Sequence, residues 1–379
     1  MARKFKKRKE LTVKKANTVK QLERETPTDT HYTFQEIDLT NDEIDWSKFE
    51  LSSCCFLGCD MNPKDQLHLI KNGAQILSKP QSLPYDPFRK KLYSFSELMD
   101  GFSVEQDNSV DLNIYEHFSQ FRFNPPMEEA LWQRIHDYSI DEALRELLQF
   151  DEKGMTRLKC VGFMGGHSTQ RTDFYYKQTA IAAKLVAEAG YFVVSGGGPG
   201  IMEAANLGAY FAGRPLRDLE DALMTLSMAP SYTDAAYHVK ALEVIERHPE
   251  GGQSLAIPTW FYGHEPSNLF SPNIAKYFSN SIREDTLLAI CLYGIVYAPG
   301  SAGTTQEVFQ EATQNHYGTF NYYSPMIFLG KERYEIQTMI YPLLKQLAWG
   351  REYFDMLYLT DEPSEVVDFL RTHPPVKKD

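Results

Sequence analysis

The sequence predicts an α/β protein whose main domain is a doubly wound parallel sheet. Short apolar runs alternate with helical patterns from Leu158 onward, and three of these runs end in glycine-rich turns. Short buried strands that alternate with helices are typical of a parallel sheet with helices on both faces. Hydrophobic residues make up 42% of the 379 residues, enough for one large domain and a smaller module.

Residues 1–45 are polar and charged, and they are predicted to form a basic arm. The first 24 residues hold ten Lys or Arg and two Glu, so this segment carries about +8 and the remainder about −20. Such a segment is most often solvated and disordered, and the alternative is contact with RNA, another polyanion or an acidic partner. The overall net charge of −12 argues against a protein that coats nucleic acid.

The sequence favours a cytoplasmic location. No apolar segment follows the basic run as in a secretory signal, and no stretch has the length of a membrane span. The five cysteines are odd in number and lack the paired spacing of a zinc site. We therefore expect reduced, structural thiols and no metal.

Residues 46–150 are predicted to form a small α/β module with a connecting helix. Two short strands, 54–58 and 74–77, flank a helix at 65–72. Three prolines between 80 and 87 then favour an extended path. The segment 127–150 has apolar residues at helical spacing and is predicted to lead into the main domain.

Residues 151–379 are predicted to form a Rossmann-like domain, because its expected strands and helices alternate in order. The expected strands are 158–163, 191–195, 254–257, 294–298, 326–329 and 357–359. The expected helices are 173–189, one that begins near 201, 218–228, 233–247, 270–292, 305–315, 332–347 and 362–370.

Three glycine-rich turns at strand ends predict a phosphate-binding site. Ligands of such sheets bind outside the carboxyl ends of the strands, where glycine allows close backbone approach and the next helix presents free N–H groups. One such turn is weak evidence, but three on one sheet are stronger. The predicted ligand-binding residues are Gly165, Gly166, His167, Ser168, Gly197, Gly198, Gly200, Met202, Glu203, Glu265, Gly300, Ser301, Gly303 and Thr304.

The commoner nucleotide motifs are absent from the sequence. The turn Gly196–Ile201 lacks the sixth-position glycine of the dinucleotide fingerprint, and no P-loop motif occurs. Bound NAD or ATP is therefore disfavoured.

Two residues are candidates for chemistry, Glu307 and Arg283. Glu307 follows the third turn by about one helical turn, where a carboxylate can stabilise an oxocarbenium-like sugar and activate water. Its alternative role is to favour the helix dipole, and Glu311 is expected on a solvated helix surface. Arg283 suits phosphate or carboxylate binding, and its alternative is a surface ion pair.

The segments Gly196–Ala204 and Pro299–Glu307 resemble the two signatures of the LOG family, once labelled lysine decarboxylases. The turn that begins at Gly165 and the stretch Glu265–Asn268 are similar to its long branch of nucleotide 5′-monophosphate nucleosidases. This resemblance covers about residues 158–330.

The resemblance implies hydrolysis of the N-glycosidic bond of a nucleoside 5′-monophosphate to free base and ribose 5-phosphate. It implies that Arg283 and Glu307 are the catalytic residues and that the glycine turns bind the phosphate and the ribose. It implies no metal, no organic cofactor and a homo-oligomer. A pyridoxal mechanism is rejected, since no lysine occupies these turns.

Two positions depart from the family pattern. Glu284 follows Arg283 where the family has lysine, and Ser301 stands where the family has a second glycine. The alternative function is a non-catalytic protein that binds or senses nucleotides on the same fold. The sequence leaves open which base is bound, and whether His167, Glu265 or water protonates the leaving base.

Overall fold

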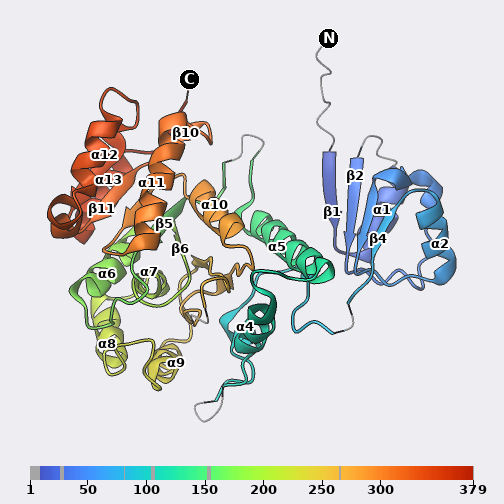
Figure 1. Cartoon of the computed structure of the whole chain (residues 1–379), viewed down its shortest axis with the longest axis horizontal. Helices are drawn as coiled ribbons and strands as arrows, with labels where there is room; N and C mark the ends of the chain where they lie inside the picture. Colours follow the sequence, from blue (N-terminus) through green and yellow to red (C-terminus); the bar gives the residue numbers. More distant parts are fainter. Residues whose placement is uncertain are drawn as a thin grey trace. The chain divides into compact units, whose positions relative to one another are not determined.

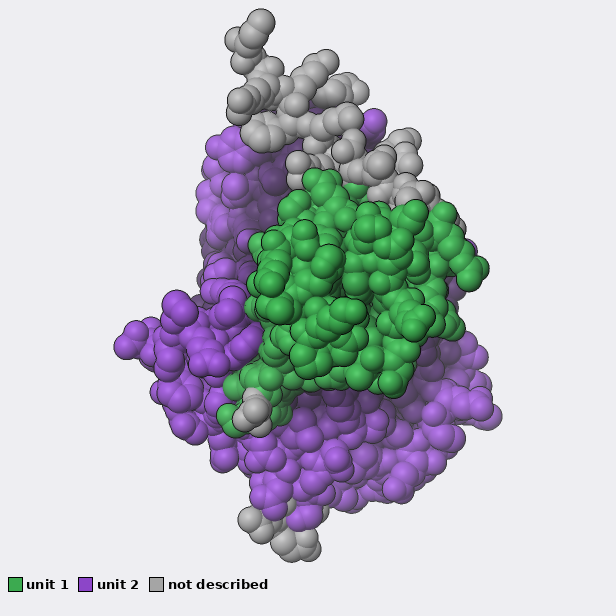
Figure 2. All heavy atoms as spheres, turned by 90° about the vertical axis from the view of Figure 1, so that its right-hand side faces the viewer, with its two compact units in different colours: residues 1–91, 138–142 green, residues 92–137, 143–379 purple. Residues whose placement is uncertain are grey.

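The computed structural model describes residues 9–25, 30–80, 82–103, 107–151, 155–263 and 266–378. The chain divides into two compact units, which Figure 2 colours separately. The first comprises Met1–Lys91 with Tyr138–Glu142, and the second comprises Leu92–Asp137 with Ala143–Asp379. These boundaries differ from those expected at residues 45 and 150.

The first unit contains a four-stranded parallel sheet in the order β1-β2-β3-β4. Its core is aromatic, with Phe34 stacked on Phe56 and edge-on to Trp46. Its elements are β1 (Lys9–Val13), α1 (Ala16–Glu25), β2 (Thr30–Gln35), β3 (Cys54–Leu57), α2 (Pro63–Lys71) and β4 (Gln75–Leu77).

The expectation of a disordered arm over residues 1–45 therefore differs from the structure wherever that segment is described. Apolar residues between the basic ones close the core, since Val13 and Val19 are buried. Lys20 is half exposed and pairs with Asp42 at 2.6 Å, so the basic charge is partly balanced inside the unit. Residues 1–8 lie outside the described residues.

The second unit contains a seven-stranded sheet in the order β12-β11-β9-β5-β6-β7-β8, and each neighbouring pair is parallel. This is the predicted Rossmann-like α/β fold. The strands are β5 (Cys160–Met164), β6 (Phe192–Ser195), β7 (Leu255–Ala256), β8 (Asn273–Ile274), β9 (Ile295–Tyr297), β11 (Met326–Leu329) and β12 (Leu357–Thr360).

Helices cover both faces of this sheet (Figure 1). Alternate residues of β5 show this: Val161 and Phe163 face one core cluster, while Gly162 faces Cys291 beyond α10. The helices of this unit are α3 (Phe95–Leu98), α4 (Val110–Phe121), α6 (Phe174–Glu188), α7 (Ile201–Tyr210), α8 (Leu216–Leu226), α9 (Tyr237–Arg247), α10 (Asn280–Ile290), α11 (Ala302–Tyr317), α12 (Ile340–Ala348) and α13 (Pro363–Thr372), together with the parts of α5 (Met127–Leu148) outside Tyr138–Glu142. A small antiparallel pair, β10 (Tyr322–Tyr323) with β13 (Val376–Lys377), completes the unit.

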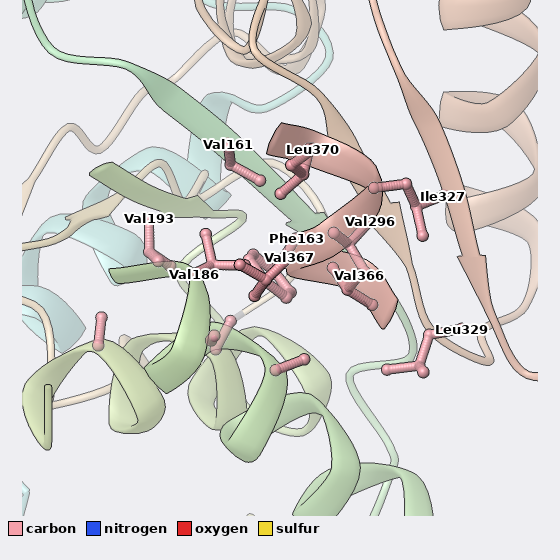
Figure 3. Packing of buried hydrophobic residues seen from close by; sticks show 14 of the residues in the cluster. Val161, Phe163, Val186, Val193, Val296, Ile327, Leu329, Val366, Val367 and Leu370 are labelled. Carbon is pink, nitrogen blue, oxygen red and sulfur yellow. The ribbon is translucent and has the colours of Figure 1, made fainter. Parts of the chain in front are cut away.

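One cluster of buried hydrophobic residues joins the strands to α6, α7 and α13 (Figure 3). Small residues let α6 and α7 approach closely: a Cβ on Gly208 would lie 2.1 Å from the carbonyl oxygen of Ala180. This packing holds α7 against the sheet, and α7 begins directly after the turn that follows β6.

Two predicted helices differ from the structure. The segment 270–292 contains the edge strand β8 before α10, because Pro272 cannot continue a helix. The segment 332–347 is divided into the π-helical η3 (Glu332–Gln337) and α12, with Met339 at φ +55° between them. No helix among the described residues is long and apolar enough to cross a membrane.

We expect Gly208→Ala to lower the free energy of unfolding by about 1–3 kcal/mol, because the added methyl meets backbone atoms of α6. Gly303→Ala is the matched control, since a Cβ there meets nothing within 4 Å and alanine favours a helix. Urea unfolding measures both variants. Equal effects of the two variants would contradict the close packing of α6 on α7.

Candidate functional site

The candidate site lies where the sheet reverses its direction of winding. From β5 the chain adds β6, β7 and β8 on one side, and then returns to place β9 on the other side of β5. The loops after β5 and β9 therefore leave in opposite directions and open a crevice at the carboxyl edge. All three predicted glycine turns follow β5, β6 or β9.

The peptide groups on either side of Gly166 join these three turns. Its N–H donates to the carbonyl of Pro299 at 3.0 Å, and its own carbonyl accepts from the N–H of Ile201 at 3.1 Å. Gly200 has φ +68°, and a Cβ there would lie 2.3 Å from the Gly166 oxygen. Any larger residue at Gly200 would push the turns after β5 and β6 apart.

A buried amide network supports the turn after β6. Ser195 Oγ donates to Asn206 Oδ1 at 2.6 Å and accepts from the N–H of Gly197 at 3.0 Å. Asn268 Nδ2 donates to the same Asn206 oxygen, and its backbone N–H donates to the carbonyl of Gly197. This network holds the backbone of the turn after β6 in place.

The three turns border a small pocket with a cavity volume of about 120 Å³. Of the predicted residues, the pocket is lined by Gly165, Gly166, His167, Gly198, Met202, Arg283, Ser301, Gly303, Thr304 and Glu307. It is also lined by residues not predicted as ligand contacts: Met164, Gly196, Pro258, Thr259, Tyr262 and Glu284. The three that follow β7, Pro258, Thr259 and Tyr262, lie in a segment without a glycine signature.

Five of the predicted ligand residues that the structure describes are not part of the pocket lining: Ser168, Gly197, Gly200, Glu203 and Gly300. Gly197, Gly200 and Gly300 act on the backbone of the turns instead. Gly300, for example, leaves room for Thr304, whose hydroxyl would lie 2.1 Å from a Cβ at position 300. Glu265 lies outside the described residues.

The surroundings of Glu203 do not support its predicted contact with a ligand. Its carboxylate is 1% exposed and accepts two hydrogen bonds from Arg171, at 2.6 and 2.9 Å, and one from the Tyr176 hydroxyl at 2.6 Å. Burial alone would raise the pKa of Glu203, but Arg171 and the hydroxyl bonds hold that pKa below its usual value. Glu203 therefore serves as the internal counter-ion of Arg171.

Arg283 and Glu307 meet at one wall of the pocket. Arg283 Nη1 lies 3.5 Å from Glu307 Oε1, and the two side chains are only 9% and 11% exposed. Arg283 Nε also donates to the carbonyl of Ile257 at 2.8 Å, and Nη2 donates to the carbonyl of Gly196 at 3.4 Å. The guanidinium thus links the segment after β7, the turn after β6 and α11.

Burial raises the pKa of Glu307 to about 7. Arg283 opposes this rise, while the nearby charge of Glu284 adds to it. Glu284 is itself fixed, because Asn280 and Gln306 donate to its two carboxylate oxygens at 2.8 and 2.7 Å. A carboxyl group with a pKa near neutrality suits a residue that exchanges a proton during catalysis.

Glu311, expected on a solvated surface, is instead 3% exposed on the buried side of α11. Burial raises the pKa of Glu311 to about 8. It lies one helical turn beyond Glu307 and outside the pocket lining. The polar character of Glu311 gave no sequence signal of burial.

Asp137 on α5 holds the start of α10, which carries Arg283. Its two carboxylate oxygens accept the N–H groups of Phe278 and Ser279, both at 2.9 Å, and it is 1% exposed. The N–H of Arg283 in turn donates to the carbonyl of Ser279. Sequence reasoning missed this residue, because it lies about 140 positions before the helix that it caps.

The Ser301 departure fits the backbone of its turn. Ser301 has φ −110°, so a side chain is accommodated there without the left-handed conformation that favours glycine. Among the described residues, no group of three His, Cys, Asp or Glu is arranged to hold a metal ion.

No family model and no curated protein matches this sequence. Among solved structures, the chain is similar to the molybdenum cofactor binding protein from the phototrophic bacterium Rippkaea orientalis, with 14% identity and a TM-score of 0.37 over 57% of this chain and 97% of that one. It is also similar to a Moco carrier protein from Chlamydomonas reinhardtii, with 16% identity and a TM-score of 0.36 over 57% of this chain and all of that one. The protein TM1055 matches at 14% identity and a TM-score of 0.35 over 57% and 100% of the two chains. Likenesses this distant carry no conclusion about function.

We expect the buried Glu311 to make the protein less stable as pH rises. Its folded pKa of about 8 lies above the usual value of 4.5, so the folded state binds the extra proton between these values. The free energy of unfolding should therefore fall from about pH 5 to pH 9. Glu311→Gln should remove on the order of 2–4 kcal/mol of this pH-dependent loss of unfolding free energy. The loss caused by the raised pKa of Glu307 should remain.

Urea unfolding at pH 5 and pH 9 measures this difference. The exposed Glu220, which pairs with Lys177 at the surface, provides the control Glu220→Gln. Identical pH dependence in the wild-type protein and Glu311→Gln would contradict the buried acid.

Proposed function

We propose that this protein hydrolyses the N-glycosidic bond of a nucleoside 5′-monophosphate and releases free base and ribose 5-phosphate. The observation that carries the proposal is the buried Arg283–Glu307 pair at the wall of a pocket formed by three glycine-rich turns. Glycine turns suit an anion, whereas a buried carboxylate beside a guanidinium suits chemistry at a sugar. The LOG resemblance makes the same assignment.

The N-terminus of α11 is the proposed phosphate site. Ser301, Gly303 and Thr304 line the pocket there, and the space beside the Cα of Gly303 is open. The first N–H groups of a helix lack intrahelical partners, and the helix dipole favours a negative charge beside them. A phosphate at this point leaves the sugar near Glu307, one turn further along the same helix.

Glu307 is proposed to act on the sugar and on water. As the C–N bond to the base breaks, positive charge develops on the ribose ring, and an ionised carboxylate stabilises it. A water molecule that donates a hydrogen bond to Glu307 then forms the new C–O bond, and its proton passes to the carboxylate. The departing base takes the electron pair of the broken bond and a proton from surrounding water, and Glu307 returns its proton to solvent, so the reaction consumes one water.

Arg283 is proposed to orient Glu307 and to keep part of the carboxyl population ionised. Its own charge is held by two backbone carbonyls, so its direction does not depend on the ligand. A pocket that only binds nucleotides needs the anion site but gives no role to a carboxyl group with a pKa near 7. This favours the hydrolase over the alternative of a binding protein.

We expect Glu307→Gln to lower turnover of a nucleoside monophosphate by about 10²–10⁴-fold, because the variant cannot accept the proton of water. Glu311→Gln is the matched control on the same helix, and it should keep turnover within about threefold because Glu311 lies outside the pocket. Release of free base and ribose 5-phosphate, followed by mass spectrometry, measures both. Turnover that survives in Glu307→Gln would overturn the role of this residue, and a wild-type protein that binds monophosphates without turnover would favour the non-catalytic alternative.

We expect activity to rise with pH through about 7, since only the ionised form of Glu307 accepts a proton. Glu284→Gln removes a negative charge that helps to raise the pKa of Glu307, so the midpoint of this rise should move to lower pH. The pH profiles of kcat and kcat/KM measure the shift. A midpoint that stays in place, or moves upward, would contradict the assigned electrostatics.

A further inference from the structure

Two consecutive residues of η3, Arg333 and Tyr334, hold the turn after β9 from outside the pocket. Arg333 Nη2 donates to the carbonyl of Gly300 at 2.6 Å, and the Tyr334 hydroxyl donates to the carbonyl of Ala298 at 2.7 Å. Tyr334 is buried and Arg333 is half-buried, and neither lines the pocket. The two bonds therefore act on the outer side of the turn.

The geometry of the peptide bond gives the Arg333 contact a consequence inside the pocket. In a trans peptide the C=O of one residue and the N–H of the next point in opposite directions. The peptide between Gly300 and Ser301 is trans, so the N–H of Ser301 points away from Arg333. Ser301 lines the pocket at the start of α11, where the proposed phosphate binds.

We propose that Arg333 is a positioning residue for anion binding: it holds the Gly300 carbonyl outward and so aims the Ser301 N–H at the phosphate of the ligand. The inference rests on the phosphate site of the proposed function. Arg333 acts through the peptide and does not itself touch the pocket.

Tyr334 provides the internal comparison. The peptide whose carbonyl it binds joins Ala298 to Pro299, and proline has no N–H. The Tyr334 bond thus steadies the turn but aims no donor at the ligand. The two neighbouring contacts should therefore differ in their effect on anion binding, although both hold the same turn.

The π-helical shape of η3 brings both side chains to one turn. The N–H and the hydroxyl of Thr338 both bond to the carbonyl of Arg333, the backbone bond spanning five residues, which closes the wide turn. Gly330 lies just before this segment, and a Cβ there would come within 3.2 Å of the Pro299 ring. Such π-helical turns are frequent at functional sites.

The test is the binding of ribose 5-phosphate and of inorganic phosphate, measured by calorimetric titration. Arg333→Met should weaken both probes about tenfold, since one aimed, charge-assisted contact is lost. Arg333→Lys, which keeps the charge and one donor, should recover part of this loss.

Two matched controls separate the alternatives. Lys331→Met removes an exposed charge two residues away, and Tyr334→Phe removes the neighbouring contact to the turn. Both should leave the affinity for the two probes within about twofold. An equal loss of affinity in Lys331→Met would mean that long-range charge explains the effect of Arg333→Met. An equal loss of affinity in Tyr334→Phe would mean that general support of the turn explains it. Either result, or an unchanged affinity in Arg333→Met, overturns the proposal.

A crystal structure of ligand-free Arg333→Met separates this inference from the proposed function. The positioning role requires the Gly300–Ser301 peptide to rotate once its carbonyl is released. A peptide that keeps its orientation overturns the inference even if the wild-type protein hydrolyses nucleotides. A rotated peptide supports it even if no turnover is found.

Discussion

The backbone contacts of Gly166 are the constraint on which the rest of the site depends. Its N–H and its carbonyl bond to the turns after β9 and β6, so three turns from three adjacent strands form one rigid surface. The surface exists only because glycine stands at Gly200 and Gly300, where a Cβ would meet neighbouring atoms at 2.3 and 2.1 Å. These contacts bring the helix that carries Glu307 beside the segment that receives Arg283.

The carboxyl groups buried around this surface differ in how fully their charges are balanced by neighbouring side chains. Arg171 takes Glu203 as its own partner, and the two amides of Asn280 and Gln306 satisfy Glu284. Within the described part of the chain, Glu307 is paired with Arg283 at 3.5 Å, and burial raises the pKa of Glu307 to about 7. A buried carboxylate whose charge is only partly balanced lowers the stability of the folded protein at high pH. At a functional site, the same carboxyl group can gain and lose a proton near neutral pH.

The sequence predicted six of the seven strands of the main sheet, the sheet class and the turns, because each depends on local signals, but it missed β1, β2 and β8. Apolar runs of four or five residues mark β5 and β6, and glycine marks the points where chain segments approach each other. It could not predict contacts made at long range. The partner of Glu203 is Arg171, the cap of α10 is Asp137, and the order of residues 9–25 and 30–45 depends on pairing of β1 with β2 and of β2 with β3. None of these contacts follows a periodicity or a residue spacing that can be recognised in a single sequence.

We propose that the three joined turns and the Arg283–Glu307 pair form a single site for a sugar phosphate. A crystal structure of Glu307→Gln with a nucleoside 5′-monophosphate tests it most directly. We expect intact nucleotide, with its phosphate at the N-terminus of α11 and its glycosidic carbon facing residue 307. A phosphate bound elsewhere, or a sugar turned away from residue 307, would contradict it.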